Sequence, residues 1–312
     1  MNVLLFPGQG SQVVGMGLEF FNKFKIVKEL FAQADEKLKF KISKVILDGP
    51  EDQLKLTQNT QPAILIVSYS IFSVLKHNFG LKPESFKFYA GHSLGEYSAL
   101  VCSQSLNFDD AIYLLRERGK AMQTAVPLGQ GSMIAVLGTQ IDDVKNIIKE
   151  TNFQKGTCEV ANDNADGQVI LSGDSKSIDL IKIKLKKKKI KTIPLKVSAP
   201  FHCSLMRPAA KIMEEKINKT NFEKPLVEIV NNVTATVENT SNIKKLLVDQ
   251  IFSTVKWRES LIYMSDNNVK NFIEIGPGKS LSGMVKRTLK DVNSFSINSI
   301  TDIEKINDEF KR

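Results

Sequence analysis

A serine between two glycines is the first group in this sequence that could do chemistry. Residues 91 to 95 read Gly-His-Ser-Leu-Gly, and the pattern Gly-x-Ser-x-Gly is typical of a nucleophile elbow. The glycines of an elbow permit a sharp turn from a strand into a helix, and this turn holds the serine Oγ clear of the backbone. The first N–H groups of that helix can then stabilise an oxyanion. The pattern therefore predicts Ser93 as a nucleophile.

A serine nucleophile needs a general base, and the sequence offers three histidines. His92 is adjacent to Ser93, and adjacent side chains on a turn point apart, so we expect His92 to pack against or orient the elbow. His77 lies near the end of an expected helix, where an imidazole can bond the last carbonyls. His202 lies in a loop over residues 198 to 206, and loops on a rigid scaffold often carry catalytic bases. We therefore predict His202 as the base.

A second glycine-containing loop, Pro-Gly-Gln-Gly-Ser-Gln at residues 7 to 12, follows a short apolar run. It lacks the Lys-Ser/Thr ending of a P-loop, and Val13 stands where a dinucleotide-binding fingerprint has its third glycine. Both phosphate-binding interpretations are therefore disfavoured. A loop at the end of a neighbouring strand can instead supply one backbone N–H to an oxyanion hole.

Apolar patterns predict the elements that position these groups. Residues 2 to 6 and 86 to 90 indicate buried strands, and Leu94, Tyr97 and Val101 share one face of a helix after the elbow. Further elements are listed by residue range: helices at 26–39, 61–78, from Asn107, 206–218 and 243–252, and strands at 227–231 and 271–275. Strands that alternate with helices imply a mostly parallel sheet covered on both sides.

The middle of the chain has a different order of elements. Residues 132 to 197 predict strand, helix, strand, strand, helix and strand, which is the βαββαβ order of a ferredoxin-like module. Their ranges are 132–138, 141–150, 158–163, 167–173, 175–187 and 190–197. The predicted fold class is therefore α/β: an α/β-hydrolase-like core from residues 1–128 and 198–312, with a ferredoxin-like subdomain inserted at 129–197.

Composition indicates a globular protein without a membrane span. The 312 residues are 42% hydrophobic and 25% charged, and no apolar run reaches the roughly 18 to 20 residues that a bilayer requires. The N-terminus has no basic segment of a secretory signal, so we expect a cytoplasmic protein. The three cysteines have neither the number nor the spacing of a disulfide framework or a zinc site. We expect no metal.

The formal net charge of +9 favours an acidic partner, which could be nucleic acid, a membrane surface or an acidic protein. Seven lysines lie between residues 180 and 191. This run is either a solvated helix face or part of a docking surface. It contains no interleaved aromatic residues, which argues against a nucleic-acid groove.

A series of motifs, taken in order along the chain, resembles those of malonyl-CoA:acyl carrier protein transacylases. The motifs are Gly8-Gln9-Gly10-Ser11-Gln12, Gly91-His92-Ser93-Leu94-Gly95-Glu96-Tyr97, Arg116-Glu117-Arg118-Gly119 with Met122-Gln123, Asn162 with Gly167-Gln168-Val169, Pro200-Phe201-His202, Asn231-Asn232-Val233 and Glu274-Ile275-Gly276-Pro277-Gly278. Their order is more specific than any single member.

The resemblance implies a role for each site residue. Ser93 would carry the malonyl group as an ester, with His202 as general base and then general acid. The backbone N–H groups of Gln9 and Leu94 would form the oxyanion hole. A main-chain carbonyl near Gln250 would orient the histidine, so a dyad is expected rather than a triad.

Further residues are implied in substrate binding. Arg118 would hold the malonyl carboxylate by a two-pronged contact; read from the sequence without the family, a salt bridge to Glu117 or Asp110 is an equal alternative. Phe201 and Leu94 would favour malonyl over methylmalonyl. The other implied substrate-binding residues are Gln12, Met122, Asn162 and Gln250. No cofactor is implied beyond the coenzyme A thioester and the phosphopantetheine of the acyl carrier protein.

Three other functions are compatible with parts of this pattern. An esterase or thioesterase would use the same elbow and histidine, but Arg118 favours an anionic acyl group. In addition, no acid between Ser93 and His202 stands in a motif typical of the Asp in Ser–Asp–His order. A non-catalytic carrier-docking protein would lack Ser93 or His202. An acyltransferase domain of a polyketide synthase is possible, although the chain begins at its first strand and ends soon after its last motif. We expect a stand-alone, monomeric enzyme of fatty acid biosynthesis that binds neither nucleic acid nor membrane.

Overall fold

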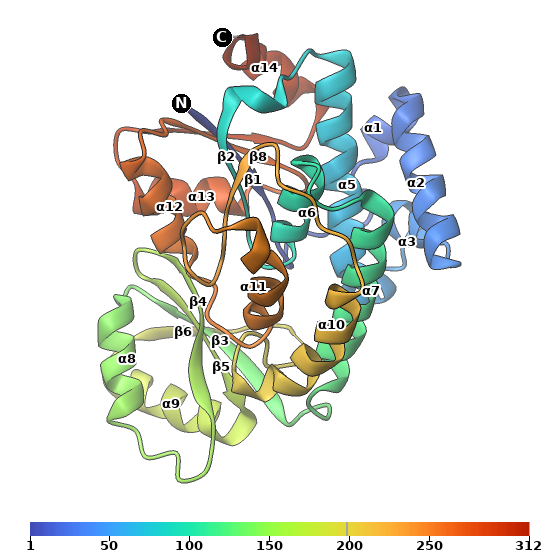
Figure 1. Ribbon diagram of the computed structural model, residues 1–312. Coiled ribbons are helices and arrows are strands. Elements are labelled where there is room, and N and C mark those ends of the chain that lie inside the picture. Colours follow the sequence, from blue (N-terminus) through green and yellow to red (C-terminus); the bar gives the residue numbers. More distant parts are fainter. Residues whose placement is uncertain (198, 312) are drawn as a thin grey trace.

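The structure is a computed structural model that describes residues 1–197 and 199–311 (Figure 1). Residues 198 and 312, which bound the C-terminal part of the predicted large domain, lie outside the described residues. The described residues contain two sheets, one of five strands and one of four, together with the helices that pack against them. No helix among the described residues is long and apolar enough to cross a bilayer.

The larger sheet has the strand order β7-β2-β1-β8-β9, and each neighbouring pair is parallel. Its strands are β1 (Asn2–Phe6), β2 (Phe86–Gly91), β7 (Glu228–Val230), β8 (Asn271–Ile275) and β9 (Asn293–Ile297). The central strand β1 is apolar from Val3 to Phe6, and these four residues are buried because helices cover both faces of the strand. Leu4 and Phe6 belong to one buried cluster, and Val3 and Leu5 belong to the cluster on the opposite face. The predicted α/β fold with a mostly parallel sheet is confirmed.

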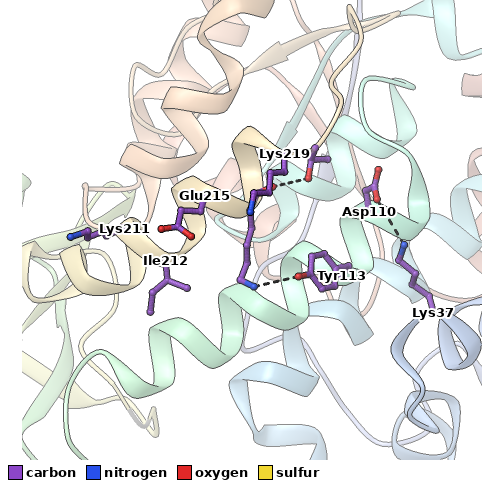
Figure 2. A pocket seen from close by; sticks show the side chains of 9 residues that line it. Lys37, Asp110, Tyr113, Lys211, Ile212, Glu215 and Lys219 are labelled. Atoms are coloured by element: carbon purple, nitrogen blue, oxygen red, sulfur yellow. Dashed lines mark hydrogen bonds and ion pairs between the residues drawn. The ribbon is translucent and has the colours of Figure 1, made fainter.

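Different helices supply these two faces. The first cluster includes α2 (Lys25–Leu38), α5 (Thr57–Asn78), α6 (Gly95–Cys102), α7 (Phe108–Thr124) and α10 (Arg207–Asn218). The second includes α12 (Trp257–Asp266) and α13 (Ser280–Thr288). Where α2 approaches α7, Lys37 Nζ lies 3.9 Å from Asp110 Oδ1 (Figure 2).

The smaller sheet is antiparallel, with the order β4-β5-β3-β6. Its elements follow one another as β3 (Gly131–Leu137), α8 (Ile141–Lys149), β4 (Cys158–Ala165), β5 (Gln168–Asp174), α9 (Ser175–Lys187) and β6 (Lys191–Pro194). This is the predicted βαββαβ order. The strand predicted over 190–197 is observed only over Lys191–Pro194, and beyond it the Leu195 N–H still bonds the Met133 carbonyl oxygen of β3 at 3.0 Å.

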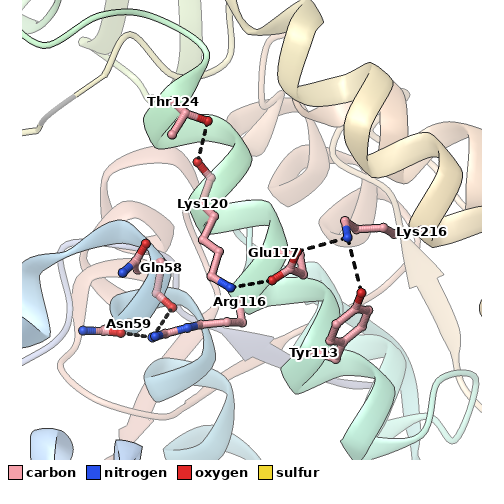
Figure 3. Close-up of polar contacts among 8 residues, drawn as sticks. All are labelled: Gln58, Asn59, Tyr113, Arg116, Glu117, Lys120, Thr124 and Lys216. Carbon is pink, nitrogen blue, oxygen red and sulfur yellow. Dashed lines mark hydrogen bonds and ion pairs between the residues drawn. The ribbon is translucent and has the colours of Figure 1, made fainter. Parts of the chain in front are cut away.

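The helix α5 begins four residues earlier than predicted and contains Pro62. A proline in a helix leaves the carbonyl four residues before it without its usual donor. Here that carbonyl belongs to Gln58, and it accepts a hydrogen bond of 3.2 Å from Arg116 Nη1 on α7 (Figure 3). An arginine from a neighbouring helix thus satisfies the group that Pro62 leaves unpaired.

Several elements were not predicted from the sequence. They are α1 (Leu18–Lys23), α3 (Ile42–Leu47), α4 (Glu51–Lys55), α12, α13, β9 and α14 (Ile300–Lys311). The predicted helix over 243–252 is observed as α11 (Ile243–Gln250). The helix after the elbow was expected to bury one face, but all eight residues of α6 are buried because it lies beneath other helices. All three cysteines are free and buried.

Candidate active site

Ser93 lies on a sharp turn between β2 and α6. Its φ is 54°, in the left-handed region where non-glycine residues are uncommon. Both flanking glycines are required by close packing. A Cβ at Gly91 would lie 1.9 Å from the Gly95 carbonyl carbon, and a Cβ at Gly95 would lie 2.2 Å from the Phe6 carbonyl oxygen. The geometry is that of the elbow predicted from the sequence.

The structure places His202 beside this serine. Ser93 Oγ and His202 Nε2 are 2.8 Å apart, and His202 Nδ1 lies 2.8 Å from the Gln250 carbonyl oxygen. A carbonyl can only accept, so Nδ1 carries the proton and Nε2 is free to accept the Ser93 hydroxyl proton. The main-chain carbonyl of Gln250 therefore orients the base, and no carboxylate takes that position.

Burial keeps His202 neutral. The side chain is 5% exposed, and burial together with the positive charge of Arg118 lowers the pKa of His202 to about 3. An unprotonated imidazole at neutral pH can accept a proton at once, which a general base requires.

Arg118 lies next to the dyad, on α7, and is 1% exposed. Its Nη2 donates to Ser93 Oγ at 3.2 Å and to Gln250 Oε1 at 2.9 Å, and its Nη1 donates to Gln61 Oε1 at 2.8 Å. Its Nε has no hydrogen-bond partner among the described residues. A guanidinium has five N–H groups, and three of them are used here, so the Nε–H and one Nη1–H remain unused beside the nucleophile.

The alternative salt bridges of Arg118 are not formed. Glu117 instead pairs with Lys120 at 2.7 Å and with Lys216 at 3.0 Å (Figure 3), and Asp110 lies near Lys37. Arg118 points away from both carboxylates and into the cavity that Ser93 also lines.

Ser93 and Arg118 line a cavity of about 400 Å³. The other residues that line it are Gln9, Gly10, Gln12, Lys55, Gln61, His92, Leu94, Met122, Met133, Asn162, Leu195, Lys196, Val197, Phe201 and His202. Every site residue named from the sequence is therefore in the cavity wall except Gln250, which lies behind it and contacts the site through Arg118 and His202.

Two main-chain donors in the wall are unused. Among the described residues, neither the N–H of Gln9 nor that of Leu94 has a hydrogen-bond partner. Gln12 shapes the first of these segments, because its Oε1 accepts from the Gly10 N–H at 2.7 Å. Two free N–H groups near a nucleophile are what an oxyanion hole needs.

Sequence reasoning assigned no structural role to three polar residues that hold the site together, although Glu96 and Asn232 stand in the family motifs. Gln61 bonds Arg118, Asn232 Oδ1 accepts from the Ser93 N–H at 2.7 Å, and Glu96 accepts from Gln250 Nε2 at 2.7 Å. All three are at most 2% exposed. Polar residues inside apolar runs were the available signal, but it does not say which partner each one has.

His92 serves the elbow from the other side, as expected. Its Nε2 lies 2.8 Å from Asn164 Oδ1 on β4, and its ring packs edge-on against Trp257 with centroids 5.5 Å apart. His92 is thus held by β4 of the smaller sheet and by α12, which packs against the larger sheet. His77 lies in the last turn of α5, away from this cavity.

Comparisons with known proteins agree with this geometry. The family model of the acyl transferase domain matches residues 3–307. A malonyl CoA-acyl carrier protein transacylase of Bacillus subtilis (strain 168) is 40% identical over 302 residues, which are 96% of this chain and 94% of that protein. This chain belongs to the acyl transferase family, among the malonyl CoA-acyl carrier protein transacylases.

Other transacylases of this family cover the same length. The one from Escherichia coli (strain K12) is 38% identical over 296 residues, 94% of each chain. The crystal structure of the Bartonella henselae acyl-carrier-protein-S-malonyltransferase has a TM-score of 0.96 at 38% identity and covers 100% of this chain and 99% of its own. A malonyl-transacylase solved in complex with a type II PKS acyl-carrier protein has a TM-score of 0.95 at 34% identity, over 99% of both chains.

Proposed function

We propose that this protein transfers a malonyl group from malonyl-CoA to the phosphopantetheine thiol of an acyl carrier protein, in fatty acid biosynthesis. The observation that carries the proposal is the guanidinium of Arg118, 3.2 Å from the Oγ of Ser93, which is itself 2.8 Å from His202. A nucleophile and a base alone fit many acyl transfers. The buried cation beside them favours an acyl group that carries a carboxylate.

The reaction has two balanced halves. Ser93 Oγ attacks the thioester carbonyl while its proton passes to His202 Nε2, and collapse of the tetrahedral intermediate expels coenzyme A, whose thiolate takes that proton. The carrier thiol then gives a proton to His202 and attacks the Ser93 ester, and Ser93 recovers its proton as it leaves. The N–H groups of Gln9 and Leu94 would stabilise each oxyanion.

Arg118 would select the acyl group. Its free Nε–H and a neighbouring Nη–H can together bind the two oxygens of the malonyl carboxylate. Acetyl-CoA would leave the buried guanidinium unpaired, and a hydrogen bond to a charged group contributes roughly 1.5 to 3 kcal/mol, or about 10- to 150-fold. The carboxylate would also offset the charge that lowers the pKa of His202, so malonyl binding would strengthen the base.

The rest of the cavity wall fits the same substrate. Phe201 and Leu94 supply apolar bulk against an added methyl group on malonyl, while Met122, Gln12 and Asn162 line the remaining wall. Lys55 and Lys196 line the cavity and are exposed, so their charges can meet the phosphates of coenzyme A at its mouth.

The acceptor would be an acyl carrier protein, as in the solved complex of a 34% identical malonyl-transacylase. The net charge of +9 suits an acidic carrier, since complementary charge raises encounter rates. Docking on the lysines of residues 182 to 191 is part of this proposal, and an unchanged KM for the carrier after charge reversal there would exclude it. A monomeric state, a cytoplasmic location and the absence of any metal or cofactor remain predictions.

Intact-mass measurement tests the function directly. We expect the wild type, after brief exposure to equal malonyl-CoA and acetyl-CoA, to gain a malonyl adduct that disappears when holo acyl carrier protein is added. Ser93→Ala, the matched control, should gain none. Release of coenzyme A without an adduct or an acylated carrier would make the protein a hydrolase and overturn the proposal.

A further inference from the structure

A buried glutamate lies behind the catalytic dyad, outside the cavity wall. Glu96 is in the first turn of α6, three residues after the nucleophile, and is 2% exposed. Burying a carboxylate is costly unless it is paired and hydrogen-bonded. The reaction described above gives Glu96 no role, so the burial of a carboxylate at this position requires a reason.

Its hydrogen bonds lead to Gln250. Glu96 Oε2 accepts from Gln250 Nε2 at 2.7 Å and from the Asn232 N–H at 3.2 Å, and Glu96 Oε1 accepts from Asn231 Nδ2. Gln250 Oε1 in turn accepts from Arg118 Nη2 at 2.9 Å. The Gln250 side-chain amide therefore connects the glutamate to the guanidinium.

The two ends of this chain fix how the amide points. Burial raises the pKa of Glu96 to about 7, so above that pH the carboxylate is ionised and can only accept hydrogen bonds. A guanidinium can only donate them. The Gln250 amide must therefore turn its NH₂ toward Glu96 and its oxygen toward Arg118. In the opposite orientation, an NH₂ would face the guanidinium and a carbonyl oxygen would face the carboxylate, with neither bond made.

We propose that Glu96 is a positioning residue for acyl-group selection, which acts through the Gln250 amide to hold the Arg118 guanidinium facing the acyl site. The inference rests on the proposed malonyl transfer, and it adds Glu96 as the residue that keeps the Arg118 guanidinium in place. The main chain of Gln250 also orients His202, so one residue connects Glu96 to both the selecting cation and the base.

Charge supports the same assignment. No carboxylate pairs directly with Arg118 among the described residues, and its hydrogen-bond partners are the neutral groups of Gln61, Gln250 and Ser93. Burial lowers the pKa of Arg118, and the nearby charge of Glu96 opposes that shift. Separated by one amide, Glu96 stabilises the cation without occupying the donors that a substrate carboxylate needs.

The variant Glu96→Gln tests the proposal at pH 8. An amide at position 96 is neutral and can present either a donor or an acceptor, so the carboxylate's share in orienting the Gln250 amide is lost. Arg118 and the Ser93 carbonyl oxygen, which accepts from Gln250 Nε2 at 3.0 Å, are then the groups that still favour the native orientation. We expect the ratio of kcat/KM for malonyl-CoA to that for acetyl-CoA to fall about tenfold, mostly through a higher KM for malonyl-CoA. Glu96→Asp, which keeps the charge but withdraws it by one methylene, should show a smaller fall.

A matched control exists elsewhere in the larger sheet. Glu274 is fully buried, and its carboxylate accepts from the N–H groups of Leu281 and Ser282 at the start of α13, outside the cavity. Glu274→Gln should lower the melting temperature and leave the malonyl-to-acetyl ratio unchanged.

The outcomes separate the two proposals. If Glu96→Gln and Glu96→Asp lose activity equally toward both acyl groups, as Glu274→Gln would through instability alone, the glutamate is merely structural and the inference is wrong. If the wild type itself transfers no malonyl group, the proposed function fails first.

Discussion

At the scale of single residues, the unusual feature of the dyad is how far burial moves the proton affinity of its base. A histidine with a pKa near 6.5 is half protonated at pH 6.5, and the protonated half cannot act as a base. His202 has a pKa of about 3, so its imidazole stays neutral at pH values well below 6.5. The rate at which Ser93 reacts with an uncharged reagent should therefore not titrate near neutrality.

Inactivation by phenylmethylsulfonyl fluoride measures this property without the malonyl carboxylate. We expect the second-order rate constant, corrected for reagent hydrolysis, to change less than about twofold between pH 5 and pH 8. Ser93→Ala is the control for reaction elsewhere. A sigmoid profile with its midpoint between pH 6 and 7 would contradict a depressed pKa of His202.

Arg118 should not be replaceable by lysine. A lysine is a single point charge and cannot reach Gln61 and Gln250 while also offering two parallel donors to a carboxylate. We expect Arg118→Lys to lower kcat/KM for malonyl-CoA by about 10- to 150-fold and to change that for acetyl-CoA much less.

Arg116 provides the matched control for that substitution, two positions earlier on the same helix. It bonds the Gln58 carbonyl and Asn59 on α5 (Figure 3) and does not line the cavity. Arg116→Lys should lower stability while the malonyl-to-acetyl ratio stays at the wild-type value. Equal losses of that ratio in both variants would count against a selecting role for Arg118.

The sequence predicted the candidate catalytic residues better than the residues that position them. Ser93 lies in a recognisable Gly-x-Ser-x-Gly turn, and the sequence contains only three histidines that could act as its general base. Glu96 and Asn232 instead act through partners more than one hundred positions away in sequence. Such contacts depend on the tertiary fold, and local sequence patterns do not predict them.

At the scale of elements, the elbow depends on two glycines that let a strand, a turn and a helix approach closely. Gly95→Ala would place a Cβ 2.2 Å from the Phe6 carbonyl oxygen of β1, which is backbone and cannot move aside. We expect this variant to be insoluble or to lose more than about 3 kcal/mol of unfolding free energy, measured by urea denaturation.

Gly283 is the helical glycine to compare with it. It lies within α13, and a Cβ there would meet nothing within 4 Å. Gly283→Ala should therefore raise the unfolding free energy by about 0.5 to 1 kcal/mol, since alanine is the better helix former. If Gly95→Ala proved as stable as Gly283→Ala, the close approach would not be what requires the glycine.

The strongly alternating elements were predicted, whereas the missed ones are short or polar elements together with three C-terminal helices, α12, α13 and α14. The alternating strands of the smaller sheet and the two helices between them gave distinct signals. β9 (NSFSI) is mostly polar and was missed, because it lies at the edge of the larger sheet and is covered less than β1. Helices of five or six residues, such as α1 and α4, are too short to show a period.

At the scale of the whole molecule, the cavity lies between the two sheets, because residues from the parts of the chain that form each sheet line its wall. Met133 and Asn162 of the smaller sheet face Ser93 and Arg118 across it. The join includes a backbone bond of 3.0 Å from the Asp163 N–H to the Val255 carbonyl oxygen. Substrate selection therefore depends on contacts that hold β4 against the segment before α12.

The side-chain part of that join is an ion pair. Arg258 Nε on α12 lies 2.9 Å from Oδ2 and 3.1 Å from Oδ1 of Asp163, which is 1% exposed. Burial raises the pKa of Asp163, and the charge of Arg258 opposes that rise. Arg258→Ala would leave an uncompensated buried carboxylate, so we expect it to cost about 2 to 4 kcal/mol at pH 8 and to lower kcat/KM.

The pH dependence of that loss identifies its cause. Without Arg258 the folded-state pKa of Asp163 rises further above its unfolded value, so the folded state binds the proton more tightly and stability falls as pH rises through that pKa. The gap in unfolding free energy between Arg258→Ala and the wild type should therefore be larger at pH 8 than at pH 5. Adding Asp163→Asn, which removes the buried charge, should recover part of it at pH 8. An equal difference at both pH values would mean that the loss of stability comes from lost packing of the Arg258 side chain and not from the unpaired carboxylate of Asp163.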